Sequence, residues 1–193
     1  MVKIVPANEN LKQEGVKIGI QAVKEDGTPV GKEIQLSTYP VEIGRANDEG
    51  IKGISEHQRA IRGRDGKDIT PVDYVVARYP EGVNIIEGIY GRWGVSDGTD
   101  ATHRSYLKIS PTGNGVIIAY AKENLFPVKV RDENGFYTLP SDKKIVLEKG
   151  EEVYLHLSGT YTKVGEAPSG AWIMEPAWLK IRVLRELSKE LYS

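Results

Sequence analysis

Few residues in this sequence have the types and spacing that chemistry requires. The 193-residue chain contains no cysteine, which excludes disulfides, thiolate metal sites and cysteine nucleophiles. The three histidines, His57, His103 and His156, are far apart, and no two of them have the H-x3-H spacing of zinc sites. We therefore expect neither a metal nor a cofactor.

Sets of a nucleophile and a base are equally sparse. Ser55-Glu56-His57 is a contiguous cluster, but neighbouring side chains point in different directions, so contiguity does not indicate a triad. Gly113-Asn114-Gly115 lacks the Gly-Lys-Ser end of a P-loop. We expect no catalytic residues and a protein that is not an enzyme. An enzyme of unrecognised type, with its site in the glycine-rich residues 46–100, is kept as an alternative.

The balance of charge excludes other classes. With 26 Lys and Arg against 27 Asp and Glu, the net charge of -1 argues against a nucleic-acid partner. No apolar run approaches the roughly 20 residues of a membrane helix, and the first residues lack the apolar stretch of a signal peptide. We expect a cytoplasmic protein with no membrane partner. Two methionines beside many Lys, Glu, Ile and Val are the direction that composition takes in thermophile proteins.

Short alternating segments separated by turns indicate a mainly β fold. Apolar residues alternate with polar ones on both sides of Asp26-Gly27, and Asn134-Gly135 is a strong hairpin signal. In 153–157, Val153, Leu155 and Leu157 fall on one face. Strands at such short intervals predict a β-sandwich, whereas the β-α-β alternation of nucleotide-binding folds is absent.

Two segments depart from the strand pattern. Residues 46–100 are rich in glycine and predict a loop-rich insertion, with short strand candidates at 74–76 and 83–86. Residues 176–193 have apolar residues every three or four positions and predict one amphipathic helix. The predicted organisation is thus one domain over 1–193. It has a sandwich over 16–157, the insertion 46–100 within it, and the C-terminal helix 176–193.

The order of these pieces resembles a forkhead-associated (FHA) domain, a β-sandwich family that reads phosphothreonine in partner proteins. That family has I-G-R, then S-R-x-H-A-x-I, then a loop with Asn-Gly, then an L-x-x-G-D-x-I strand pair. Here Ile43-Gly44-Arg45, residues 102–109, Asn124 and residues 147–155 follow in that order. The resemblance covers about 140 residues of this chain, Val16 to Leu157. It implies an eleven-stranded sandwich in which Arg45, Asn124 and residues 103–105 meet at one edge.

The resemblance implies a role for Arg45 and Asn124. Arg45 aligns with the family arginine beside the phosphopeptide, where a planar fork of donors suits a phosphate. Asn124 aligns with the asparagine that fixes the peptide backbone, although Leu125 follows it where the family has glycine. In the strand pair at 147–155, Glu151 replaces the family aspartate.

The segment before Ile109 departs further from the family pattern. When Ile109 is aligned with the terminal isoleucine, His103 takes the position of the phosphate-binding serine and Arg104 that of the arginine. Tyr106 takes the position of the structural histidine. Ser105 is nearby and could supply a hydroxyl, so we include His103, Arg104 and Ser105 among the expected ligand-binding residues.

Two other alignments remain open. Residues 54–61 have the length and flanking isoleucines of the S-R-x-H-A-x-I motif, with Ser55 in register, and lie nearer to Arg45. Tyr90-Gly91-Arg92 could also be the Gly-Arg element for the His103 segment. Ser55 and Arg92 are therefore the alternative ligand-binding residues.

The sequence thus predicts a module that binds a phosphorylated or acidic protein segment. Its mechanism would be charge-assisted hydrogen bonds from Arg45 and the neighbouring loops. The main alternative is a structural or scaffold protein that does not bind phosphate and forms a homo-oligomer through the C-terminal helix and the apolar residues 171–178.

Overall fold

Strands account for the regular structure of the described part of the chain. The computed structural model describes residues 16–46, 72–92, 104–122, 124, 126–170 and 172–185. Within those residues there are fourteen strands and no helix. The strands are β1 (Ile18–Val23), β2 (Ile34–Leu36), β3 (Val41–Ala46), β4 (Val72–Tyr79), β5 (Gly82–Arg92), β6 (Arg104–Pro111), β7 (Gly115–Tyr120), β8 (Val128–Asp132), β9 (Gly135–Thr138), β10 (Ile145–Glu148), β11 (Glu152–Leu157), β12 (Thr160–Glu166), β13 (Trp172–Pro176) and β14 (Trp178–Val183).

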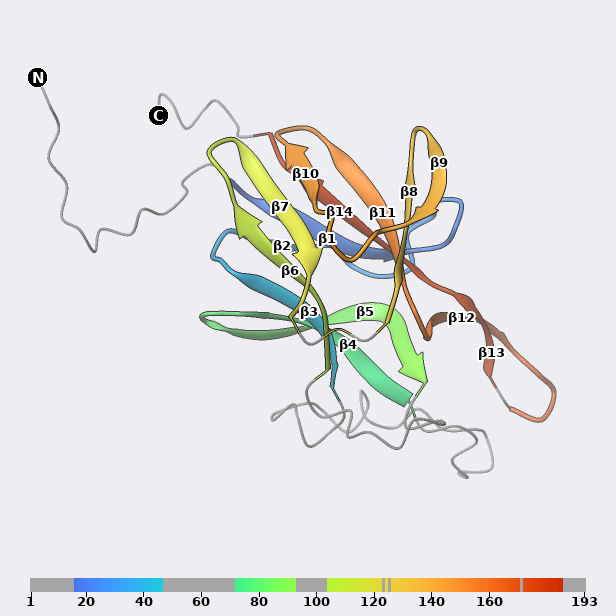
Figure 1. Ribbon diagram of the computed structural model, residues 1–193. Helices are drawn as coiled ribbons and strands as arrows, with labels where there is room; N and C mark the ends of the chain where they lie inside the picture. Colours follow the sequence, from blue (N-terminus) through green and yellow to red (C-terminus); the bar gives the residue numbers. More distant parts are fainter. Residues whose placement is uncertain are drawn as a thin grey trace, which may run out of the picture.

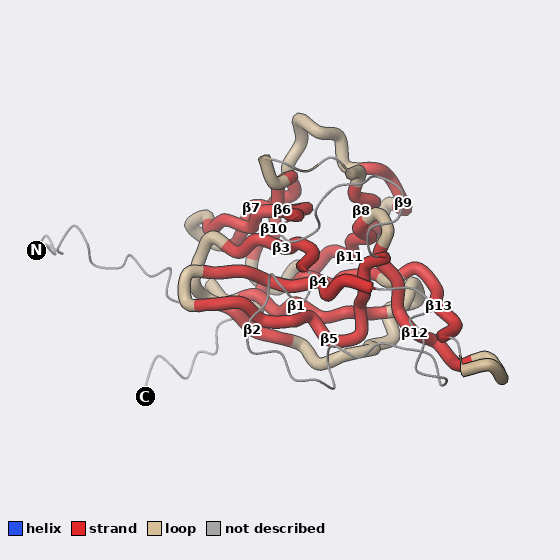
Figure 2. The backbone as a smooth tube through the Cα atoms, turned by 90° about the horizontal axis from the view of Figure 1, so that it is seen from below, coloured by secondary structure: helices blue, strands red, loops and turns tan. Residues whose placement is uncertain are grey.

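The strands form two antiparallel sheets in a sandwich-like arrangement (Figures 1 and 2). The six-stranded sheet has the order β2-β1-β14-β11-β8-β9, and the eight-stranded sheet has the order β10-β7-β6-β3-β4-β5-β12-β13. The mainly β class predicted from the sequence is therefore confirmed. The hairpin of β12 and β13 projects from the body of the molecule, at the lower right of Figure 1.

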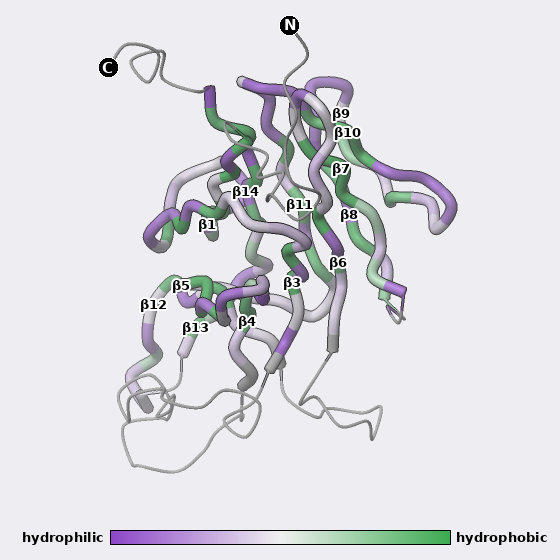
Figure 3. Tube along the Cα trace, turned by 90° about the vertical axis from the view of Figure 1, so that its left-hand side faces the viewer, coloured by the Kyte–Doolittle hydropathy of each residue, from purple (hydrophilic) through white to green (hydrophobic). Residues whose placement is uncertain are grey.

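A single apolar core draws residues from both sheets. Along β11 the burial alternates, with Val153, Leu155 and Leu157 buried and the residues between them more exposed. Full burial of one such side chain contributes about 1.5–3 kcal/mol. Figure 3 shows that hydrophobic residues are concentrated in the strands and that many of the connections are hydrophilic. The period of two seen in the sequence thus sets which face of each strand enters the core.

Both predicted hairpins are confirmed. Asp26-Gly27 turns the chain between β1 and β2, with Gly27 at φ 92° and the Asp26 carboxylate accepting a 2.8 Å hydrogen bond from the Thr28 amide. Asn134-Gly135 joins β8 to β9, and Gly135 has φ 114°. Positive φ is a conformation that glycine adopts at little cost, so these turns are specified by a few adjacent residues.

The helix predicted over 176–193 is wrong for the part of it that the structure describes. Residues Trp178–Val183 form β14, which pairs with β1 on one side and β11 on the other in the middle of the six-stranded sheet. Leu179, Ile181 and Val183 are fully or almost fully buried, an alternation of two and not of three or four. The sandwich therefore continues well beyond residue 157. Residues 186–193 lie outside the described residues.

The segment 46–100 contributes two strands to the eight-stranded sheet. The strand candidates at 74–76 and 83–86 are confirmed as parts of β4 and β5, which pair with each other. β4 also pairs with β3, and β5 with β12, so both lie inside the sheet. The remaining residues of this segment, 47–71 and 93–100, lie outside the described residues.

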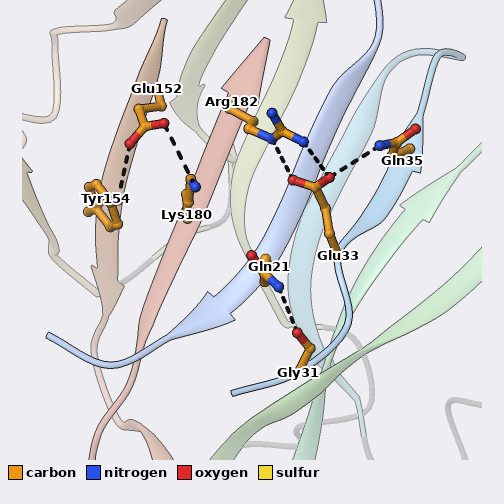
Figure 4. A network of polar contacts seen from close by, with 8 residues as sticks. All are labelled: Gln21, Gly31, Glu33, Gln35, Glu152, Tyr154, Lys180 and Arg182. Carbon is orange, nitrogen blue, oxygen red and sulfur yellow. Dashed lines mark hydrogen bonds and ion pairs between the residues drawn. The ribbon is translucent and has the colours of Figure 1, made fainter. Parts of the chain in front are cut away.

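Polar contacts tie the outer face of the six-stranded sheet together (Figure 4). The Glu33 carboxylate accepts two hydrogen bonds from Arg182, at 2.6 Å from Nε and 2.8 Å from Nη2, and a third from Gln35 at 3.2 Å. Across the same face, Lys180 lies 3.8 Å from Glu152. These contacts join β14 to the segment before β2 on one side and to β11 on the other.

Candidate functional site

The predicted ligand-binding residues that the structure describes lie in strand ends and one connection at the same end of the sandwich. β3 ends where β6 begins, because the two strands are antiparallel, and Gly44 pairs with Ser105 and Arg45 with Arg104. β4 begins and β5 ends at the same level, since Ala46 pairs with Tyr74 and Val72 with Arg92. These ends lie at the lower side of Figure 1.

The connection between β7 and β8 reaches the same end. The Ala121 amide donates a 2.9 Å hydrogen bond to the Tyr106 carbonyl, and the Asn124 amide donates one of 3.0 Å to the Ala121 carbonyl. Asn124 is thereby held beside the start of β6. We call the region formed by Gly44, Arg45, Ser105 and Asn124 the Arg45 end.

Arg45 lies on the inner face of the eight-stranded sheet and is only 6% exposed. It pairs in register with Val75, whose side chain belongs to the core. Its guanidinium crosses the backbone of β5 so closely that a Cβ atom added to Gly91 would stand 2.5 Å from Nε and 3.1 Å from Cζ. Arg45 is therefore a buried and closely packed cation, in contrast to the solvated loop charge that a Gly-Arg dipeptide usually supplies.

Asn124 uses its side chain to shape its own loop. Its Oδ1 accepts a 2.6 Å hydrogen bond from the Phe126 amide, and its Nδ2 donates one of 2.7 Å to the Phe126 carbonyl. An amide oxygen can accept a second hydrogen bond and an NH2 group can donate a second one. The side chain thus keeps capacity for a peptide backbone while the loop conformation is fixed.

Tyr106 occupies a β-bulge at the Arg45 end. Between Ile43 and Gly44 the register with β6 shifts, so that Tyr106 has no partner position on β3. Both Tyr106 and Leu107 are fully buried, although adjacent residues of a regular strand face opposite sides. Bulges redirect side chains in this way, often beside functional sites.

The buried Tyr106 hydroxyl connects the start of β6 to the turn between β11 and β12. It donates a 2.8 Å hydrogen bond to the Ser158 carbonyl. The Ser158 hydroxyl in turn donates one of 2.8 Å to the Pro127 carbonyl, just before β8. The tyrosine that departs from the resembled motif thus ties the two sheets together at this end.

The other predicted residues differ in how much the structure describes. Ser105 is partly buried at the start of β6 and pairs with Gly44, the residue before Arg45. Arg104 and Arg92 have their backbone positions at the same end, which follows from their register partners. His103 and Ser55 lie outside the described residues.

Sequence reasoning missed Gly91 and the turn at Ser158-Gly159 as parts of this region. In the sequence Gly91 is only the glycine of an alternative Gly-Arg dipeptide, and Ser158-Gly159 belongs to no motif that indicates a site. Gly91 approaches Arg45 across β4, which pairs with both β3 and β5, and Ser158 meets Tyr106 at the turn between β11 and β12, so both approaches depend on strand pairing. No local pattern in the sequence encodes that pairing.

Comparisons and searches add no further assignment. No family model, curated protein or solved structure matches the chain. The described residues contain no group of three or more His, Asp or Glu side chains that could hold a metal ion. Over the same residues, no helix has the length and apolar character needed to span a membrane.

Proposed function

We propose that this protein is a binding module, similar to a forkhead-associated domain, that takes a phosphothreonine-bearing or acidic segment of a partner protein at the Arg45 end. The observation that carries the proposal is that the backbone positions of Arg45, Ser105 and Asn124, from β3, β6 and the β7–β8 connection, lie at the same end of the sandwich. A guanidinium, a hydroxyl and an amide are suitable donors for a phosphate and for the peptide that bears it.

The strand arrangement supports the same family. β5, β12 and β13 are consecutive at one edge of the eight-stranded sheet. Without these three strands, sheets of six and five strands remain, which together make the eleven strands implied by the resemblance. We interpret β5, β12 and β13 as an extension of an eleven-stranded sandwich.

The burial of Arg45 supports a preorganised site. Its side chain has little freedom left to lose, so ordering it costs little when a ligand arrives. Each charge-assisted hydrogen bond to the ligand would then contribute about 1.5–3 kcal/mol. A fixed guanidinium also favours anions that match the geometry of its donor fork.

A scaffold that forms oligomers is the second candidate, and exposed apolar residues on edge strands favour it. Phe136 on β9 is 59% exposed, Val146 on β10 is 57% exposed and Ile173 on β13 is 48% exposed. Each of these strands lies at the edge of a sheet, where backbone groups can pair with another chain. In this candidate function the edges, and not a C-terminal helix, would provide the contacts.

The proposed function is tested with a library of phosphothreonine peptides. We expect the library to yield a peptide that binds the phosphorylated form preferentially and loses affinity by tenfold or more in Arg45→Ala. Arg45→Lys should recover only part of the affinity, because an ammonium lacks the bidentate fork. Because Arg45 is buried and Arg45→Ala leaves a cavity, Arg45→Met is a second variant that removes the charge while filling most of the space.

Arg182→Ala is the matched control, since it removes one arginine from the outer face of the six-stranded sheet. Folding of each variant is checked by circular dichroism. Equal binding of phosphorylated and unphosphorylated peptides, together with indifference to Arg45→Met, would contradict the phosphate-binding function. Concentration-dependent oligomers in size-exclusion chromatography would then favour the scaffold.

A further inference from the structure

The pairing between β5 and β12 forms a narrow seam beneath the Arg45 side chain. Only two residue pairs define it, Gly91 with Thr160 and Tyr90 with Tyr161. Gly159 immediately precedes β12 and has φ 76°. Gly91 of β5 and Gly159 of the turn before β12 thus lie close to each other where β12 pairs with β5.

The guanidinium of Arg45 rests on these two glycines. A Cβ atom at Gly91 would lie 2.5 Å from Nε, 3.0 Å from Cδ and 3.1 Å from Cζ. A Cβ atom at Gly159 would lie 3.8 Å from Nη1, which is ordinary van der Waals contact. Close packing of this kind tolerates no added methyl group at Gly91 unless the arginine moves.

The seam itself is held firmly. Thr160 is fully buried, and its hydroxyl donates a 2.7 Å hydrogen bond to the Leu157 carbonyl. The Thr160 carbonyl accepts a 3.2 Å hydrogen bond from the Ala177 amide, just before β14. The backbone that packs against Arg45 is therefore hydrogen-bonded to the residue before β14, in the middle of the six-stranded sheet.

We propose that the backbone at the seam of Gly91, Gly159 and Thr160 packs against the Arg45 guanidinium and so fixes its orientation. Gly91 is then a positioning residue for binding at the Arg45 end. The inference rests on the proposed function for its consequence in binding, whereas the orientation of Arg45 can be measured independently. It assigns a role to the extension β5-β12-β13, which holds the arginine of the sandwich in one direction. A ligand then binds to a guanidinium whose orientation is already fixed.

The test compares Gly91→Ala with Gly165→Ala in the full chain. Gly165 lies in the same extension, and a Cβ atom there would meet only Ile173 Cδ1 at 3.8 Å, so this variant controls for the loss of a glycine. The first measurement is the Nε–Hε resonance of Arg45 in a ¹H–¹⁵N spectrum, assigned with Arg45→Met. We expect Gly91→Ala to shift or broaden that resonance and Gly165→Ala to leave it unchanged.

The second measurement is affinity for the phosphothreonine peptide selected with the unmodified protein. We expect Gly91→Ala to weaken binding by about tenfold, the loss that corresponds to about 1.4 kcal/mol. In the Arg45→Met background the same substitution should have no further effect, because a positioning residue acts only through the group that it positions. A structural effect of the alanine would weaken binding in both backgrounds.

The outcomes separate the two proposals. An unchanged Arg45 resonance in Gly91→Ala, or equal losses of affinity in both backgrounds, overturns the proposal that Gly91 positions Arg45. If the resonance shifts but the protein binds phosphorylated and unphosphorylated peptides with equal affinity, the positioning role of Gly91 is supported and the proposed function is overturned. If Gly91→Ala alone does not fold, recovery of the folded state in Gly91→Ala with Arg45→Ala supports the clash with Arg45, and no recovery overturns it.

Discussion

At the scale of single residues, the ion pair of Glu33 and Arg182 is the best-defined polar contact on the outer face of the six-stranded sheet. The Glu33 side chain is 18% exposed and that of Arg182 is 40% exposed. Gly19 lies beneath the pair, where a Cβ atom would stand 2.4 Å from Glu33 Oε2. The hydrogen bond from Arg182 is the main reason that the pKa of Glu33 lies below its usual value.

Glu33→Gln should therefore make stability depend less on pH. A carboxyl whose pKa is lowered by folding contributes stability above its unfolded pKa and loses it as the pH falls through the folded pKa. We expect the substitution to lower the free energy of unfolding by about 1 kcal/mol at pH 7, because the pair is bidentate but partly exposed. The difference should shrink as the pH falls below about 4.3. Urea unfolding at a series of pH values measures it.

Glu133→Gln is the control for this prediction. Glu133 is exposed in the turn between β8 and β9, so its substitution should change stability little at any pH. A loss in Glu33→Gln that stays constant from pH 7 to pH 3 would show that the charge of Glu33 is not the source of the stabilisation.

At the scale of elements, β14 joins the two halves of the six-stranded sheet, because it lies between β1 and β11. It pairs along its whole length with β1 and over four residues with β11. Leu179 faces the core and pairs with Ala22 and Leu155, whereas the neighbouring Lys180 faces outward toward Glu152. A central strand of this kind has neither edge exposed to solvent.

Leu179→Ala should destabilise the protein by about 2–5 kcal/mol, the cost of a cavity left by a buried leucine. The neighbouring Lys180→Ala, which removes only a partly exposed ion pair, should cost less than about 1 kcal/mol. Midpoints of denaturant unfolding compare the two variants. Similar losses at both positions would contradict the alternation of inner and outer faces along β14.

Local signals explain which elements could be predicted from the sequence. The turns at Asp26-Gly27 and Asn134-Gly135 follow from the chemistry of adjacent residues, so their hairpins were predictable. The segment after Pro176 fits two periods at once, since Trp178, Ile181 and Leu184 have helical spacing while Leu179, Ile181 and Val183 alternate. Pairing with β1 and β11 decides between them, and that pairing is not encoded locally.

The candidate site divides in the same way. The end of β3 at Arg45 and the start of β6 near Ser105 were expected to meet, because the resemblance supplied their order. The close approach of Gly91 to Arg45 was not expected, since it depends on the pairing of β4 with both β3 and β5, which no adjacent residues specify. The bulge at Tyr106 was hidden for a related reason, as it arises from the register with β3.

At the scale of the whole molecule, one core stabilises both sheets, and the strands differ in how many neighbours protect them. β14 and β1 lie inside the six-stranded sheet, whereas β2, β9, β10 and β13 form its edges and those of the eight-stranded sheet. The core contains residues of β1, β3, β6, β11 and β14 but none of β13. In the extension, β5 adds Ile86 and Ile89 to this core whereas β12 and β13 add none, so the hairpin of β12 and β13 depends on the sandwich more than the sandwich depends on that hairpin.

Hydrogen exchange should follow this order. We expect the backbone amides of β14 that bond to β1 and β11 to exchange only when the whole protein unfolds, and those of β13 to exchange through local opening. Mass spectrometry of peptides that cover 172–176 and 178–183 measures the two rates separately. Equal protection of both segments would mean that the extension is as stable as the core.

The pairing of Ile18 with Val183 also has a consequence for biosynthesis. On the ribosome, β1 emerges early, yet its partner β14 is translated only after the rest of the sandwich. At about 5–20 residues per second, the edge of β1 that pairs with β14 stays unpaired for roughly 10–30 s. During this interval the nascent chain carries an incomplete sheet, which is the kind of surface that chaperones protect from aggregation. Slowing translation near codon 180 should therefore lower the soluble yield more than slowing it near codon 30.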